Sequence, residues 1–169
     1  MTTDVKQAHI NTSGFLVLGR NRVRALSFVG TGSAGTLAMF DTATAPVSSG
    51  VTYGRTGTTV TVTKTAHGLV TGDTVGIHFE AFPSATDGNY VITRVDANNF
   101  TLTDINSGSI SGSPAAVYVS GGGSWLLTYE SAATDIFNNS PDIPEDGDLA
   151  IKGVYAYMDN ITVANIYYG

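Results

Sequence analysis

Alternation of apolar and polar side chains runs through most of this chain and predicts β-strands. The clearest case is residues 58–63, where valine alternates with threonine in the period-two pattern of a strand with one buried face. Val75, Ile77 and Phe79 likewise share one face of a predicted strand. No segment of useful length has an apolar period of 3.6 residues, so almost no helix is expected. The predicted strands are 15–18, 20–28, 36–41, 58–63, 74–79, 90–95, 100–103, 115–119, 125–129, 150–157 and 160–168.

Four local features refine this pattern. Residues 1–12 are polar with no clear period, which predicts an N-terminal arm. Within 20–28 the alternation changes face beyond Leu26, which indicates a β-bulge. The strands on either side of residues 96–99 form a predicted hairpin, and the last two strands, joined at 158–160, form another.

The chain divides at two glycine- and serine-containing breaks, residues 46–50 and 121–124. Such stretches are typical of points where few contacts cross between parts of a protein. We therefore expect an all-β protein with a β-sandwich or jelly-roll-like host domain, built from residues 1–48 and 122–169. A small β-barrel-like module, residues 49–121, is inserted into it.

Composition agrees with a folded β-protein. Of 169 residues, 42% are hydrophobic, 13% are charged and 20 are glycine, a mixture that favours a packed core over disorder. The net charge of −6 disfavours nucleic acid and anionic membrane as partners, because the protein repels both at long range. There is no cysteine, which excludes disulfides. The first residues lack the features of a signal peptide, so we expect a protein that does not use the secretory route.

Half of the eight basic residues lie within the first 24 positions: Lys6, Arg20, Arg22 and Arg24. In a strand the three arginines share a face, where like charges repel one another unless water or acidic groups surround them. Two interpretations stay open. The arginines are either a solvated edge that prevents unwanted strand pairing, or a docking surface for an acidic partner.

No catalytic or cofactor motif stands out. His9, His67 and His78 are far apart and none has another ligand residue at metal-site spacing. The glycine-rich segment 30–35 resembles a dinucleotide fingerprint, but strand residues follow it where a helix is required, so it is a predicted turn. We expect no enzyme activity and no cofactor; an enzyme would need carboxylates that converge from distant loops.

One acidic run could hold calcium, which binds several oxygen ligands. Its spacing does not match an EF-hand, and two prolines already restrict its shape. We expect a solvated loop without a metal at Asp142, Glu145, Asp146 and Asp148.

Tyrosine is concentrated near the end of the chain, at Tyr155, Tyr157, Tyr167 and Tyr168. Tyrosine is enriched at subunit interfaces, so these residues are interface candidates. Core packing explains some of them equally well.

Part of the insert resembles a small β module that recurs in tailed-phage virion proteins. The resemblance covers about 45 residues and rests on an Ala66-His67-Gly68-Leu69 turn followed by Gly72-Asp73, on the strand that begins Gly88-Asn89-Tyr90, and on Asn98-Asn99-Phe100-Thr101-Leu102. These motifs are turns and core strands, so the resemblance transfers no functional residue. The flanking segments resemble, less specifically, small acidic β-proteins that decorate phage heads, commonly as trimers.

The resemblance implies a virion structural protein. The first expectation is a capsid decoration or cement protein, located on the capsid surface, which binds the major capsid protein as a homotrimer. The alternatives are a tail, neck or fibre component, with the insert as an adhesion module for host glycan, and a hydrolase domain of a tail spike.

Overall fold

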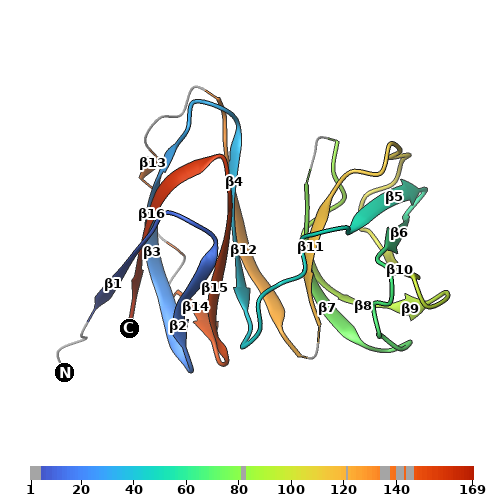
Figure 1. Cartoon of the computed structure of the whole chain (residues 1–169), viewed down its shortest axis with the longest axis horizontal. Helices are drawn as coiled ribbons and strands as arrows, with labels where there is room; N and C mark the ends of the chain where they lie inside the picture. The colour runs from blue at the N-terminus through green and yellow to red at the C-terminus, as the bar shows by residue number, and fades with distance from the viewer. Residues whose placement is uncertain (1–4, 81–82, 121, 134–137, 140–142, 144–146) are drawn as a thin grey trace. The chain divides into compact units, whose positions relative to one another are not determined.

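The chain is all-β in the computed structural model, which describes residues 5–80, 83–120, 122–133, 138–139, 143 and 147–169 (Figure 1). Within these ranges every regular element is a strand. The expected fold class is therefore confirmed. The jelly-roll connectivity stays a prediction.

Two compact units make up the chain. One comprises Met1–Ala45 and Leu126–Gly169, and the other comprises Pro46–Trp125. Each unit has a hydrophobic core of its own. We call the first unit the host and the second the insert. The boundaries between the two units lie after Ala45 and Trp125, and those predicted from the sequence lie after residues 48 and 121.

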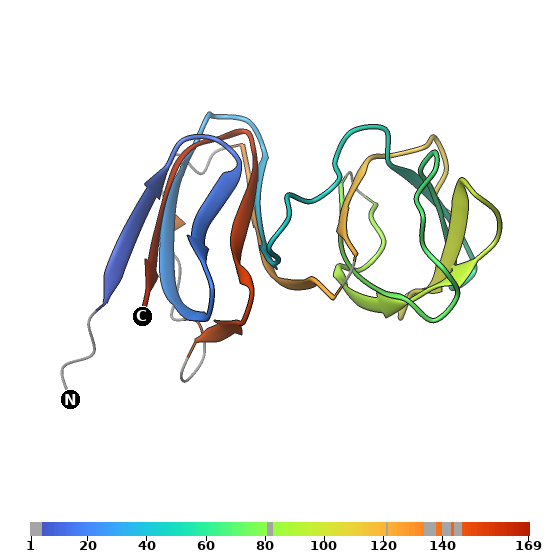
Figure 2. The ribbon, with the colours of Figure 1, turned by 60° about the horizontal axis from the view of Figure 1, so that its bottom comes forward.

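The host consists of two antiparallel sheets that pack against each other as two layers (Figure 2). Leu26, Phe28 and Ile166 from one sheet and Leu37 and Met39 from the other are almost completely buried in the shared core. The strand order of the first sheet is β1-β16-β3-β13, with β14 also on β3, and that of the second is β12-β4-β15-β2. The strands are β1 (Lys6–Ile10), β2 (Gly14–Leu18), β3 (Asn21–Gly30), β4 (Gly35–Asp41), β12 (Ser124–Ser131), β13 (Asn138–Asn139), β14 (Asp148–Ala150), β15 (Gly153–Asp159) and β16 (Ile161–Tyr168).

The insert also contains two sheets, with the orders β5-β6-β10-β9 and β11-β7-β8. Neither sheet closes into a barrel in the described part of the chain. The predicted hairpin around residues 96–99 is confirmed, because β9 and β10 pair with Phe100 opposite Arg94. The strands are β5 (Thr52–Thr56), β6 (Thr59–Thr63), β7 (Thr74–Phe79), β8 (Gly88–Val91), β9 (Thr93–Arg94), β10 (Asn99–Thr103) and β11 (Ala116–Val119).

Two expectations for the host are wrong. Residues 6–10 are not part of a free arm but form the edge strand β1, paired with β16. Gln7 and His9 in this edge strand are exposed and polar, and both hydrogen-bond to Asn165 on β16. Because these positions are polar, the sequence shows no clear alternation of apolar and polar residues in this strand. The last two strands do not form a hairpin, because Asn160 (φ 51°) lies in a turn between β15 in one sheet and β16 in the other.

The insert occupies the place of a hairpin loop in the host. It lies between β4 and β12, which are neighbours in one sheet. At its own base, Val47 and Tyr118 exchange two backbone hydrogen bonds of 2.9 and 3.0 Å, so the entering chain is fixed beside the last insert strand. A long inserted segment is therefore compatible with an uninterrupted host sheet.

A glycine in β7 allows close approach of the segment that leaves the insert. A Cβ atom on Gly76 would lie 2.2 Å from the backbone nitrogen of Trp125, so only glycine fits. The Asn89 side chain fixes the same segment, accepting from the Trp125 N–H at 2.7 Å and donating to its carbonyl at 3.0 Å. The face of β7 that carries His78 is thereby covered by backbone.

Excision of the insert is expected to leave a folded host. Replacing residues 50–121 with a short Gly-Ser linker removes no residue of the host core, and the linker has only to join neighbouring strands. Far-UV circular dichroism and dispersed amide resonances would establish a folded β-protein. An insoluble or unfolded product would show that the two cores depend on each other.

Candidate functional site

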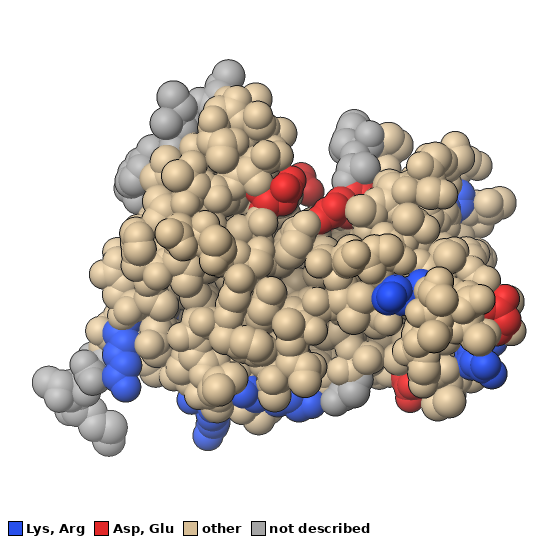
Figure 3. Space-filling model, in the orientation of Figure 1, with Lys and Arg blue, Asp and Glu red and all other residues tan. Residues whose placement is uncertain are grey.

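The four basic residues singled out in the sequence lie at one end of one host sheet. Lys6 pairs with Tyr168, and Tyr168 pairs with Val23 on β3, which places Lys6 two strands, about 10 Å, from the arginine-bearing part of β3. Figure 3 shows basic groups along the lower margin of the host. We call Lys6, Arg20, Arg22 and Arg24 the basic end.

β3 contains a bulge, as predicted, but the bulge lies at Arg24 and not beyond Leu26. Tyr168 pairs with Val23 and Tyr167 with Ala25, which leaves Arg24 as the extra residue. Because of the bulge, Val23 and Leu26 both face the core, with 0% and 2% of their surfaces exposed. The bulge thus allows one short segment of β3 to place core residues on the buried face and arginines on the other face.

The three arginines line a single surface hollow of about 300 Å³, which we call the arginine hollow. Its wall opposite β3 comes from β14, where Leu149 pairs with Arg22. Arg22 Nη1 donates to the carbonyl of Gly147 at 3.2 Å. Arg24 Nε is buried and has no hydrogen-bond partner among the described residues. The remaining lining residues are Asn21 and Gly169.

A buried carboxylate holds the turn that follows β14. Asp41, 6% exposed at the end of β4, accepts hydrogen bonds from the backbone N–H groups of Ile151, Lys152 and Gly153 at 3.0, 2.7 and 3.2 Å. These bonds fix the turn between β14 and β15. Sequence reasoning missed Asp41, although a lone carboxylate that ends an apolar strand was a usable signal.

The acidic run is only partly described. Asp142, Glu145 and Asp146 lie outside the described residues. Asp148 lies on β14, and burial raises the pKa of its carboxyl above the ordinary value. Among the residues that the structure describes, no group of three or more His, Asp or Glu side chains could hold a metal ion.

The four tyrosine candidates divide between the two host sheets. Tyr155 and Tyr157 lie on β15, where Tyr155 packs edge-on against Phe15 with ring centroids 5.0 Å apart. Tyr167 and Tyr168 lie on β16 in the other sheet. All four are half-buried and do not form one cluster.

The insert contains a buried polar network that sequence reasoning missed. Arg55 and Asp104, from β5 and the end of β10, form an ion pair with both side chains almost fully buried. The Asp104 carboxylate also accepts from the backbone N–H groups of Thr86 and Asn106 at 3.3 and 3.1 Å. Burial and the nearby carboxylates raise the pKa of Tyr90 to about 12.

The three histidines are not brought together. His9 lies on β1 in the host, and His67 packs edge-on against Phe100 in the insert. His78 is 1% exposed, and its Nδ1 lies 2.7 Å from a carboxylate oxygen of Asp87. Asp87 also accepts from the backbone N–H of Phe79 at 2.8 Å, so it fixes the end of β7.

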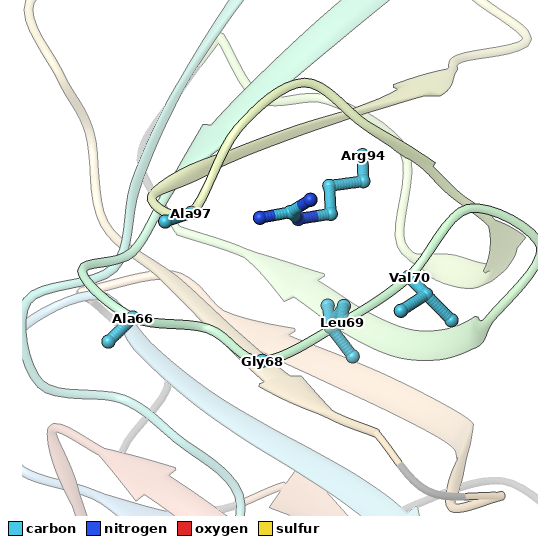
Figure 4. A pocket seen from close by; sticks show the side chains of 6 residues that line it. All are labelled: Ala66, Gly68, Leu69, Val70, Arg94 and Ala97. Atoms are coloured by element: carbon cyan, nitrogen blue, oxygen red, sulfur yellow. The ribbon is translucent and has the colours of Figure 1, made fainter.

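A second hollow, of about 320 Å³, lies in the part of the insert that resembles the phage module. Figure 4 shows the Arg94 side chain extending into the opening between the turn at Ala66–Val70 and the loop at Ala97. Gly68 and Leu69 complete the lining, which is mostly apolar apart from the guanidinium.

The described part of the chain forms no apolar helix of membrane-spanning length. In comparisons with known proteins, no family model, no curated protein and no solved structure matches this chain.

Proposed function

We propose that this protein is a structural component of a tailed-phage particle that decorates the capsid, binding the major capsid protein through its basic end. The observation that carries the proposal is the gathering of Lys6, Arg20, Arg22 and Arg24 at one end of one sheet, in a protein with a net charge of −6. A local basic surface on an acidic protein steers it toward an acidic partner in one orientation. The proposal that the particle is a tailed phage rests on the resemblance of the insert to a module of phage virion proteins.

A decoration protein that contacts several capsid subunits gains affinity from multivalency. A homotrimer fits three-fold positions of a shell, and half-buried tyrosines such as Tyr155 and Tyr157 are suited to its subunit interfaces. In this role the protein needs no catalytic group and no cofactor.

Replacing the three arginines with serine is expected to weaken binding to purified capsid shells about tenfold at low salt, because a charge pair at the protein surface contributes up to about 1 kcal/mol. Added salt should reduce the difference between the variant and the wild type, since screening weakens exposed charge interactions. Sedimentation with shells at several salt concentrations measures both effects.

Arg94→Ser in the insert is the control for the single variant Arg20→Ser, because each removes one positive charge from an exposed arginine and Arg94 lies outside the basic end. Excision of residues 50–121 should also leave shell binding unchanged. If the triple variant bound shells as well as the wild type and excision abolished binding, the attachment surface would lie on the insert and not at the basic end.

A second candidate is a tail, neck or fibre component in which the insert binds host glycan. The hollow beside Arg94 favours it, because a concave surface with one polar group suits a small polar ligand. Copy number separates the candidates: a decoration protein is present at hundreds of copies per particle, and a tail component at few. Quantitative gel analysis of purified particles gives that number.

A further inference from the structure

The hollow in the insert lies between two loops that hydrogen bonds hold together. We call it the insert hollow, and the residues that line it are Ala66, Gly68, Leu69, Val70, Arg94 and Ala97. The backbone N–H of His67 donates to the Ala97 carbonyl at 3.2 Å. The His67 ring joins the same two loops: its Nδ1 accepts from the Leu69 N–H and its Nε2 therefore carries the proton and donates to the Asp96 carbonyl, both at 3.0 Å. The two walls of the hollow are thus tied to each other.

One wall also contains a residue in an unfavourable backbone conformation. Ala66 has a φ of 52°, in the left-handed region where a side chain with a Cβ atom costs free energy. The Asn98 side chain holds this conformation, because its Oδ1 accepts from the Ala66 N–H at 3.0 Å. A strained residue persists only where its surroundings fix it, so this wall is preformed. A preformed wall loses less conformational entropy when a ligand binds.

The guanidinium of Arg94 is a cation without a counter-charge in the described part of the chain. The side chain is exposed and extends into the opening of the insert hollow (Figure 4). Its guanidinium makes no hydrogen bond or ion pair with any described residue. Carboxylates of the flanking loops are engaged by backbone groups: Asp96 accepts from the Asn98 N–H at 2.7 Å. Asp73 accepts from the Val70 N–H at 2.9 Å. The exposed guanidinium can therefore receive an anionic ligand, and its fork matches the two oxygens of a carboxylate.

The rest of the lining offers apolar surface and hydrogen-bond acceptors. Val70 is 59% exposed, and Ala66, Leu69 and Ala97 are further aliphatic members of the lining. The carbonyls of Ala66, Gly68 and Leu69 accept no hydrogen bond from any residue that the structure describes. Carbonyl oxygens accept from hydroxyl groups, and aliphatic side chains pack against C–H groups. A ligand that uses all of these features combines a carboxylate, hydroxyl groups and an apolar face.

We propose that the insert hollow binds an acidic sugar, that is, a sugar residue that carries a carboxylate. The carboxylate pairs with the Arg94 guanidinium, the C–H groups of the ring pack against Val70, and hydroxyl groups donate to carbonyls of the turn at Ala66–Leu69. A volume of about 320 Å³ equals that of roughly ten water molecules, which accommodates one sugar ring with its substituents. The inference rests on the second candidate function, for which it names the class of ligand.

Titration of the full chain with methyl glycosides, followed by NMR, tests the proposal. The acidic probes are the methyl glycosides of glucuronic acid, galacturonic acid and N-acetylneuraminic acid. The neutral probes, methyl glucoside and methyl galactoside, carry a hydroxymethyl group where the first two acids carry the carboxylate. We expect at least one acidic probe to bind saturably, with a dissociation constant of about 1 mM, and to shift the amide resonances of Gly68 and Leu69. The neutral probes should bind at least about tenfold more weakly, because they lack the charged partner of the guanidinium.

Arg94→Gln tests the contact with the carboxylate. It should weaken binding of the acidic probe at least about tenfold and leave the neutral probes unchanged, because it removes only the counter-charge. Arg94 is exposed, so the variant is expected to fold as the wild type does.

Val70→Ala tests the apolar wall. It should weaken binding of the acidic probe about threefold, because part of the surface under the sugar ring is lost. Binding of inorganic phosphate, which has no apolar face, should not change. Val91→Ala is the matched control, since Val91 is 67% exposed and lies outside the lining of the insert hollow.

Four results would overturn the proposal. They are the absence of saturable binding by all three acidic probes, equal binding of acidic and neutral probes, undiminished binding by Arg94→Gln, and tighter binding of inorganic phosphate than of every acidic probe. The last result would assign the insert hollow to phosphate.

The copy number of the protein separates failure of the site from failure of the second candidate function. Saturable sugar binding by a protein present at hundreds of copies per particle would retain the site and refute only the role in the tail. A protein present at few copies that binds none of the probes would keep that role and refute the site.

Discussion

Asp104→Ala is expected to destabilise the insert by about 3 to 5 kcal/mol, because it leaves the Arg55 guanidinium buried without its counter-charge. The truncation also removes the acceptor for the Thr86 and Asn106 backbone N–H groups. Amide hydrogen exchange of the full chain should show protection lost throughout the insert and retained in the host, since the two cores are separate. Glu130→Ala, at an exposed host position, should change stability by less than about 0.5 kcal/mol.

The double variant Arg55→Met with Asp104→Leu separates the cost of an unpaired charge from the value of the pair. Apolar groups of similar size need no counter-charge, so the double variant should lose less stability than Asp104→Ala. A double variant as unstable as the single one would mean that backbone hydrogen bonds to Asp104, rather than its charge, hold the insert together.

The same pair makes the insert sensitive to acid. Burial by itself raises the pKa of Asp104, but hydrogen bonds from Thr86, Asn106 and Arg55 outweigh it and hold the pKa below the ordinary value of 3.8. A depressed folded-state pKa stabilises the fold above the unfolded value, and this stabilisation disappears as the pH falls through the folded value. The insert should therefore retain this contribution at pH 5 and lose it at a pH below about 4.

Asp41→Ala is expected to cost the host about 3 kcal/mol or more. It leaves three backbone N–H groups of the turn between β14 and β15 without an acceptor, and each buried unpaired donor costs about 1 to 3 kcal/mol. Asp41→Asn keeps one acceptor oxygen and should cost roughly half as much. Urea denaturation of the host with the insert excised measures the loss directly.

Asp148→Asn is the matched control for Asp41. Burial raises the pKa of the Asp148 carboxyl, so its charged form is unfavourable in the fold and a neutral amide should be tolerated. If Asp148→Asn were as destabilising as Asp41→Ala, the turn would depend on both carboxylates and not on the hydrogen bonds of Asp41.

Apolar periodicity predicted the strands whose two faces differ in burial. In β6, Val60 and Val62 are fully buried between exposed threonines, and the pattern is visible without a structure. In β3 a bulge could be inferred from the change of face, but the bulge lies at Arg24 and not beyond Leu26, where the pattern placed it. Edge strand β1 escaped prediction because solvent on its outer side permits polar residues there.

Contacts between distant segments could not be predicted. Asp41 accepts hydrogen bonds from backbone N–H groups that are 110 or more residues away in the sequence. Arg55 and Asp104, which form an ion pair, are 49 residues apart. Single charged residues in strands give no periodic signal, and their partners are set by the sheet order. The arginines were recognisable as a group only because they are close in sequence; that they line one hollow with Leu149 depends on the pairing of β14 with β3.

The position of the insert between two adjacent host strands has a consequence for the order in which the chain folds. While the insert is disordered, pairing β4 with β12 closes a loop of roughly 80 residues, which costs about 2 kcal/mol more in chain entropy than a loop of five. Once the insert has folded, the bridge between Val47 and Tyr118 shortens the effective connection to a few residues on each side. The insert is thus expected to fold first and to accelerate closure of the host sheet, so that Asp104→Ala slows host folding without altering any host contact.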